Sequence, residues 1–310
     1  MCKIYKDTPD NFTDIEPYVV TKVEDAVKVI VQSGKCYFYD TCAFRRHMRV
    51  SDPKPIFDYI QQTGGVIIIT RCIIMELCSN DNKLWSEHIE YIKKINLYGI
   101  SVLVIYEEDI MSVLNACYSG ISEVNRMLSF AVKNAKSKTG TKENVLNSDS
   151  VLKKRLLIDD KNSESSLAVE FFEKVRANKT SEDNLGEELI AICVHLLSNI
   201  IEMTSFKYIV LSDDKGAITL LSKTMQNVER HIGKKCIWAV TTEKLCWLML
   251  EKNVISSKDQ VEDILKPGNT GESIKVYCSE EFELVASEKT MKIEELSEKL
   301  TNNSGIKIYF

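Results

Sequence analysis

Short apolar runs alternate with longer amphipathic segments along most of this 310-residue chain. The runs are rich in β-branched and aromatic residues, which is typical of strands buried in a parallel sheet. They cover residues 36–40, 66–70, 100–106, 207–212 and 235–240. Helical patterns lie between them, at 56–65, 70–79, 187–202, 215–226 and 241–253. Strands that alternate with helices predict an α/β fold built on a doubly wound parallel sheet.

Three stretches lie outside this alternation of strands and helices. Residues 1–35 contain one expected helix and form an N-terminal extension. Residues 107–185 form a helical insertion between the two halves of the core, 36–106 and 186–270. Residues 271–310 show a strand pattern, a helical pattern and a final strand pattern, which predict a small C-terminal α+β extension.

The composition is that of an ordinary soluble globular protein, with 44% hydrophobic and 27% charged residues. Because the formal net charge is −5, a nucleic-acid partner would have to bind a local basic surface. No apolar run approaches the roughly 20 residues of a membrane span, and the first residues lack the apolar core of a secretion signal. We therefore expect a cytoplasmic protein with no membrane partner.

Ten cysteines and four histidines raise the question of disulfides or a zinc site. Most of the cysteines lie within apolar runs, and no CxxC pair occurs. The histidines are scattered without the close spacing of metal ligands. Small buried thiols in a reducing compartment therefore explain the cysteines better than a disulfide framework or a zinc site does.

Acidic residues stand where the apolar runs end or turn, and they are the strongest chemical signal in the sequence. They are Asp40 after CYFY, Glu76 inside CIIMELC, Glu187 opening EELIAIC and Asp214 after YIVLS. A carboxylate against an apolar surface needs a partner, because a bare buried charge is too costly. The carboxyl ends of strands in an open α/β sheet share one edge. Carboxylates gathered there without His or Cys predict an oxygen-only site for a hard divalent ion.

Each of these acids also has a local explanation that needs no metal. Asp40 and Asp214 stand where helix caps are common. Glu76 would be unremarkable on a thin exposed face of its helix. Glu187 and the adjacent Glu188 lie in a first helical turn, where the macrodipole favours negative charge. Only the joint placement of the acids argues for a shared cation.

The ordered segments YDTCAF, TRCIIMEL, GEELIAIC, VLSDDKGAI and WAVTTEKLCWLML resemble the PIN-domain nucleases over residues 36–106 and 186–255. The resemblance implies a three-layer α/β/α core with strand order 3-2-1-4-5 and a metal-dependent nuclease site. By this match, the catalytic acids that bind Mg²⁺ or Mn²⁺ are Asp40, Glu76, Glu187 and Asp214.

The same resemblance suggests accessory residues. Thr41 and Ser212 match hydroxyl positions beside the acids. Asp213 stands where the family often has Asn, and it is an additional candidate metal ligand. Glu187 stands where Asp is commoner, and its neighbour Glu188 leaves the register open by one residue. The chain is more than twice as long as the minimal toxin-type members, which leaves the substrate class open.

Basic residues supply candidates for substrate binding. Arg45, Arg46 and Arg49 follow the first acid, where they would grip phosphates or lie on a solvated helix face. Residues 133–155 contain seven Lys or Arg and two acids. They would form either a surface that binds the phosphates along a nucleic acid or an ordinary solvated surface. Together with the acids they favour an endoribonuclease for single-stranded RNA, in a toxin-like, defence or RNA-processing role. An inhibitor protein or a second copy in a homodimer are further expected partners.

Two other functions fit parts of the sequence. A haloacid-dehalogenase-like phosphatase would use Asp40 as its nucleophile, but that family has a second Asp two residues later, where this chain has Cys42. That function also leaves Glu76 and Glu187 without a role. A catalytically inactive PIN-like scaffold that binds RNA or a protein is the other alternative. The nuclease accounts for more of the acids and is the function that we expect.

Overall fold

The computed structural model of the chain describes residues 5–135, 140–159, 161–181, 183–200, 206–268, 271–281, 283, 285–302 and 305–310. Within these residues, five parallel strands form a central sheet in the order β3-β2-β1-β4-β5. The strands are β1 (Lys35–Tyr39), β2 (Gly65–Thr70), β3 (Val102–Ile105), β4 (Tyr208–Leu211) and β5 (Ile237–Val240). The α/β class expected from the sequence and the strand order implied by the resemblance are both confirmed.

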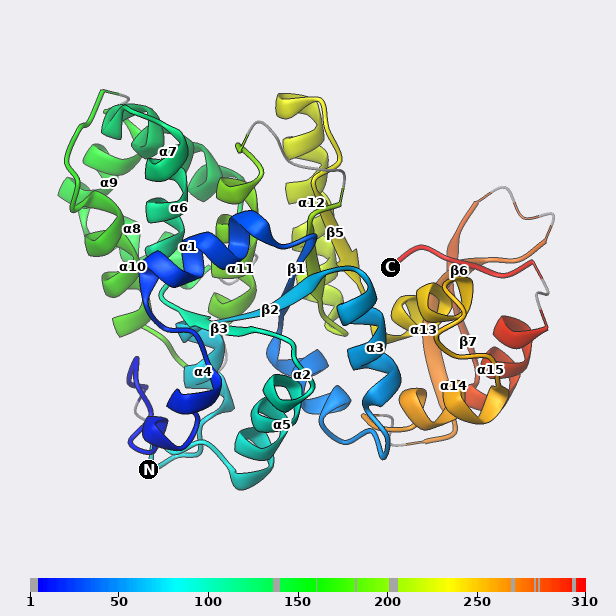
Figure 1. Ribbon diagram of the computed structural model, residues 1–310. Helices are drawn as coiled ribbons and strands as arrows, with labels where there is room; N and C mark the ends of the chain where they lie inside the picture. The colour runs from blue at the N-terminus through cyan, green and yellow to red at the C-terminus, as the bar shows by residue number, and fades with distance from the viewer. Residues whose placement is uncertain are drawn as a thin grey trace.

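Nearly every residue of these strands is buried, which is why the strands appear in the sequence as continuous apolar runs. Helices cover both faces of the sheet (Figure 1). One layer contains α1 (Val23–Gln32), α11 (Leu185–Leu197) and α12 (Lys215–Ile232). The other contains α3 (Lys54–Gln62), α5 (Ser86–Leu97) and α13 (Thr242–Glu251). The result is a three-layer α/β/α core.

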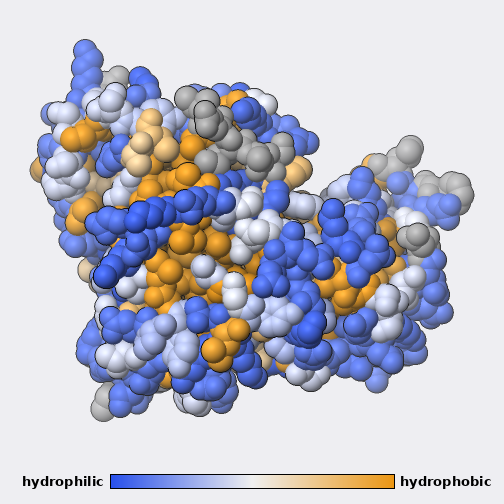
Figure 2. All heavy atoms as spheres, viewed as in Figure 1, coloured by the Kyte–Doolittle hydropathy of each residue, from blue (hydrophilic) through white to orange (hydrophobic). Residues whose placement is uncertain are grey.

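The helix α1 is amphipathic and follows two short 3₁₀ turns, η1 (Phe12–Asp14) and η2 (Glu16–Tyr18). Ala26 and Ile30 face the core, and Figure 2 shows α1 as a hydrophilic band between hydrophobic surfaces. Val27 and Val29 pack beside them, partly buried, so α1 is attached to the core through one face. In the part of the chain that is described, no helix has both the length and the apolarity to cross a membrane.

The segment between β3 and α11 is helical and gathers at one end of the molecule, green in Figure 1. It contains α6 (Asp109–Cys117), α7 (Ile121–Asn134), α8 (Thr141–Ser148), α9 (Ser150–Leu157) and α10 (Leu167–Ala177). Arg176 of α10 is fully buried, and its Nη1 lies 2.7 Å from Oε2 of Glu107, directly beyond β3. The same guanidinium contacts Glu108 and Asp7. A buried ion pair therefore attaches this segment to the sheet.

The C-terminal segment lies on the opposite side, orange to red in Figure 1. It contains α14 (Lys258–Leu265), β6 (Ser273–Ser279), β7 (Ser287–Lys292), α15 (Ile293–Thr301) and β8 (Lys307–Ile308). The strands form an antiparallel sheet in the order β7-β6-β8. The sequence pattern predicts β6, α15 and β8 but misses β7. That strand reads SEKTMK and is mostly exposed, so it has no apolar signal.

Arg46 of α2 (Thr41–His47) joins the core to this C-terminal segment. Its Nη1 lies 2.8 Å from Oε1 of Glu243 and 3.1 Å from Oδ2 of Asp213, and its Nη2 donates to the Leu265 carbonyl. All three charged side chains are largely removed from water. Burial opposes ionisation of Asp213, but the Arg46 charge holds the pKa of Asp213 below its usual range.

We expect Arg46→Met to lower the free energy of unfolding by about 3–5 kcal/mol, because two buried carboxylates lose their cation. Urea denaturation measures this loss. Arg49→Met is the matched control, since Arg49 is exposed and its loss should change stability by no more than about 0.5 kcal/mol. Equal stability of the two variants would show that the buried Arg46 does not hold these segments together.

Candidate active site

The carboxyl ends of the parallel strands bring the sequence-predicted acids to one edge of the sheet. Asp40 follows β1 and Asp214 lies just beyond the neighbouring β4. Glu76 lies in α4 (Arg71–Leu77), which begins directly after β2, and Glu187 lies in the first turn of α11. Burial raises the pKa of Glu187, and the negative charges of Asp40, Glu76 and Asp214 raise it further, so these three acids lie within electrostatic reach of Glu187.

Asp40 is buried, with 3% of its surface exposed, and both of its oxygens are held by neutral donors. The backbone N–H of Thr41 donates to Oδ1 at 2.7 Å, so Asp40 also caps α2. Oδ2 accepts from the Ser212 hydroxyl at 2.7 Å and from the Cys42 thiol at 2.9 Å. Burial raises the pKa of Asp40 to about 6, and these hydrogen bonds limit the rise.

Glu76 is held between a hydroxyl and an ammonium group. Thr41 donates its hydroxyl to Oε2, and Nζ of Lys179 lies 2.8 Å from Oε1. Lys179 also pairs with Asp183, four residues later in the turn that leads to α11. A Cβ atom on Gly186 would lie 2.7 Å from Oε1 of Glu76, so glycine is what allows α11 to approach this carboxylate. The sequence reasoning missed Lys179 and Asp183, because neither belongs to an apolar pattern.

The two adjacent acids of α11 face different parts of the protein. Oε2 of Glu187 is buried without a hydrogen-bond partner among the described residues. Burial, followed by the charges of Asp40 and Glu76, raises the pKa of Glu187 to about 8. Glu188 is fully buried against the helical segment, where its Oε2 accepts from the Lys142 backbone N–H at 3.4 Å. The structure therefore places Glu187, and not Glu188, at the edge of the sheet.

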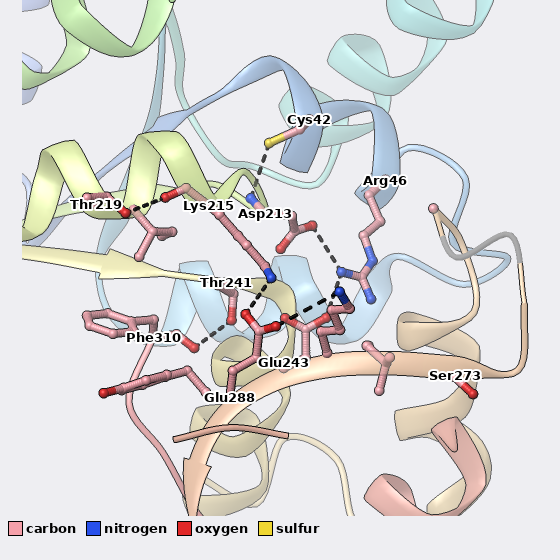
Figure 3. Close-up of a pocket in the computed structure, with 15 residues that line it drawn as sticks. Cys42, Arg46, Asp213, Lys215, Thr219, Thr241, Glu243, Ser273, Glu288 and Phe310 are labelled. Carbon is pink, nitrogen blue, oxygen red and sulfur yellow. Dashed lines mark hydrogen bonds and ion pairs between the residues drawn. The ribbon is translucent and has the colours of Figure 1, made fainter. Parts of the chain in front are cut away.

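The two adjacent aspartates after β4 also point in different directions. Asp214 is exposed and caps α12, with Oδ1 accepting from the Ala217 N–H at 2.9 Å. Asp213 accepts from the backbone N–H of Thr242 at 2.7 Å and pairs with Arg46 (Figure 3). Asp214 therefore remains beside the other acids, whereas Asp213 belongs to the buried ion pairs of Arg46.

The three sequence-predicted arginines also differ in their surroundings, since two are exposed and one is buried. Arg45 and Arg49 are exposed, and Arg45 donates from Nη2 to the Glu76 carbonyl at 2.9 Å. Arg46 is buried in its ion pairs instead of lying on the open surface. In the basic stretch 133–155, Lys142 is buried and Arg155 pairs with acids, while residues 136–139 lie outside the described part of the chain.

A hollow of about 650 Å³ opens beside the acids, between α12, α13 and the C-terminal sheet (Figure 3). Cys42 lines this hollow and also donates to Asp40, so the two features are adjacent. The cations that Figure 3 shows in the hollow are opposed by acids, since Lys215 pairs with Glu288 and Arg46 with Glu243. The hollow is therefore close to neutral.

The donor set at the sheet edge suits a hard divalent cation, because it consists of carboxylate oxygens and one of them, Oε2 of Glu187, is buried without a partner. As the described side chains stand, no group of three His, Cys, Asp or Glu residues is arranged to hold a metal ion. Instead, groups of the protein itself contact the carboxylate oxygens: the Lys179 ammonium pairs with Glu76, and the Ser212 hydroxyl donates to Asp40.

Comparison of the chain with models of known protein families, with curated proteins and with solved structures finds no match. An α/β fold of this kind hosts many unrelated activities, so the fold alone does not identify the function. The inference about function therefore depends on the side chains at the sheet edge.

We expect Glu187→Gln to stabilise the metal-free protein at alkaline pH. Folding raises the pKa of Glu187 from 4.5 to about 8, so the folded state binds this proton more tightly than the unfolded state does. The resulting stabilisation is complete below about pH 4.5 and is lost as the pH rises through about 8. Glutamine cannot ionise, so the Tm of the variant should exceed that of the parent by several degrees near pH 8.5.

Thermal denaturation in EDTA across the pH range measures this difference. Near pH 4.5 the two proteins should melt at similar temperatures. Glu229→Gln is the control, because Glu229 is exposed on α12 and pairs only loosely with Lys235, at 3.7 Å. A constant difference in Tm between Glu187→Gln and the parent at every pH would contradict the raised pKa.

Proposed function

We propose that the chain is a metal-dependent nuclease that hydrolyses phosphodiester bonds in single-stranded RNA. The observation that carries the proposal is the Glu187 carboxyl group, which has a buried oxygen without a hydrogen-bond partner in the described structure. It lies within electrostatic reach of Asp40, Glu76 and Asp214. Burying and crowding carboxylates costs free energy, and a divalent cation among them would offset that cost.

The cations of the chain itself support this view. Arg46, Arg176 and Lys179 neutralise other acids around the sheet edge. Among the described residues, no ion pair includes Asp40, Glu187 or Asp214. The carboxylates that lack an internal cation are therefore neighbours at the same edge, where an external cation would serve all of them.

Asp40, Glu187 and Asp214 would hold Mg²⁺ or Mn²⁺, and Glu76 would stand beside them. When bound, such an ion lowers the pKa of a water molecule and stabilises negative charge on the phosphate. Ser212 and Thr41 fix the two oxygens of Asp40. Hydrogen bonds of this kind orient metal-binding carboxylates and are important for affinity.

Two exposed arginines support a nucleic-acid substrate. Arg45 and Arg49 are the members of the predicted basic group that reach the surface, and Arg45 contacts α4 next to Glu76. Because the chain as a whole is acidic, binding of a polyanion would depend on such local charge. RNA is proposed over DNA because of the resemblance to PIN-domain nucleases.

We expect Asp40→Asn and Asp214→Asn each to lower Mn²⁺-dependent cleavage of a labelled single-stranded RNA by at least about 100-fold. Loss of residues that merely orient metal ligands already costs about 10- to 100-fold, and these two carboxylates would contact the ion directly. The rates of cleavage are measured with Mn²⁺, with Mg²⁺ and with EDTA. Circular dichroism and Tm check that each variant is folded.

The matched control is Glu229→Gln, which makes the same acid-to-amide change on the exposed end of α12. It should cut RNA as well as the parent does. Undiminished cleavage by Asp40→Asn would contradict the proposal. A phosphorylated Asp40 trapped with a phosphate ester would instead favour the phosphatase, and RNA binding without any cleavage would favour the inactive scaffold.

A further inference from the structure

A second hollow, of about 540 Å³, opens between α2 and the start of α5, and it shares no lining residue with the hollow in Figure 3. It is lined by Arg45, Met48, Arg49, Trp85, Glu87 and His88. An exposed indole ring and two exposed guanidinium groups therefore share one concave surface. This combination is characteristic of surfaces that bind unpaired nucleotides.

Trp85 has 55% of its surface exposed and occupies the N-cap position of α5. Its side chain makes no capping hydrogen bond. Ser, Thr, Asp or Asn at this position would stabilise the helix better, because their side-chain oxygens accept from the first N–H groups. The indole therefore contributes neither a helix cap nor a fully buried core contact, and it lines the hollow with more than half of its surface exposed.

The two arginines of this hollow differ from Arg46 in their surroundings. Arg45 and Arg49 are four residues apart, so they lie on the same side of α2 and its end. Within the described part of the chain, neither guanidinium takes part in an ion pair. Arg46, the residue after Arg45, is instead buried between two acids. The positive charge of Arg45 and Arg49 is therefore available to phosphate groups.

His88 provides a polar group on the wall of the hollow. It is buried, with 4% of its surface exposed, and its Nδ1 has no hydrogen-bond partner among the described residues. Its ring packs edge-on against Phe44, with ring centroids 5.7 Å apart. The packed ring of His88 therefore forms a fixed part of the wall of the hollow.

The hollow is adjacent to the acids at the sheet edge. Arg45 lines it and donates to the backbone carbonyl of Glu76, whose side chain belongs to the acidic group. By contrast, the hollow in Figure 3 has cations that are already paired with acids. Of these two hollows, the one at Trp85 is the better site for a negatively charged strand.

We propose that the Trp85 hollow binds one nucleotide of a single-stranded nucleic acid, with its base stacked on the indole and its phosphates on Arg45 and Arg49. This proposal rests on the proposed nuclease function, because a nucleotide bound in the hollow would place the next phosphodiester bond of the strand at the acids. A base in a duplex is already stacked on both faces and cannot lie on Trp85. The hollow would therefore select single strands over duplexes.

The test measures binding apart from cleavage. Fluorescence anisotropy in EDTA follows the parent protein with a labelled single-stranded RNA of about 12 nucleotides, a length within the usual range of such sites. Trp85→Ser should weaken binding roughly 5- to 150-fold, the factor that corresponds to the stacking of one base on an aromatic ring. Trp85→Phe keeps a stacking surface and should retain most of the affinity.

Trp85→Ser also separates binding from folding. Serine can cap α5, so the Tm of this variant should equal or exceed that of the parent. Arg45→Gln and Arg49→Gln should each weaken binding and reduce the salt dependence, by about 0.7 in the slope of log K against log salt concentration. Arg230→Gln is the control, because it removes one exposed charge near the C-terminal end of α12. It should change neither the affinity for RNA nor the salt dependence of binding.

The proposal is overturned if Trp85→Ser binds the RNA as tightly as the parent, or if the parent binds no oligonucleotide at low salt. Equal affinity of the parent for single strands and duplexes would also overturn it. Failure of the nuclease function gives a different result, namely RNA binding that depends on Trp85 without cleavage in any metal. Cleavage with an unchanged KM in Trp85→Ser would leave the nuclease standing and remove the Trp85 site.

Discussion

The crowding of carboxylates at the carboxyl edge of the parallel sheet is the constraint on which the rest of the structure depends. Parallel strands end at the same edge, and this chain places acids after or close to the end of each of them. They are Asp40, Glu76, Glu107, Asp213, Asp214 and Glu243, and α11 adds Glu187. Each carboxylate that leaves water loses hydration and repels its neighbours. The fold can keep them only where cations or neutral donors compensate for this loss.

The compensating cations also attach the segments that surround the core. The ion pair of Arg176 with Glu107 attaches the helical segment between β3 and α11 to the sheet edge, and the ion pair of Lys179 with Glu76 attaches the turn before α11. Arg46 binds Asp213 and Glu243 and reaches the end of α14 through the Leu265 carbonyl. Removing one partner of a buried pair is strongly destabilising, so these contacts fix where the added segments lie. The acids of the sheet edge thus determine the arrangement of the outer segments as well as the chemistry at the edge.

The sequence predicts the central strands well, because strands buried on both faces leave continuous apolar runs, and their parallel order brings Asp40 and Asp214 to one edge. It does not distinguish Glu187 from Glu188, because consecutive helical residues point about 100° apart and only the packing of α11 decides which one faces the acids. β7 is missed because its residues are polar and exposed. Lys179 is missed because Glu76, its partner at the sheet edge, is distant in sequence, and no periodic pattern records a contact of that kind.

The helical period of α2 explains how one short helix serves several of these contacts. Residues four apart lie on the same side, so Thr41 and Arg45 both meet Glu76, the first through its side chain and the second through its backbone carbonyl. Cys42 and Arg46 are related by the same spacing, and both meet Asp213. Asp40, the N-cap of the helix, accepts from the Thr41 backbone N–H and from the Cys42 thiol. A rotation of α2 would therefore disturb the ion pairs of Arg46 and the acidic edge together, which is why the buried Arg46 constrains the geometry around Asp40 without touching it.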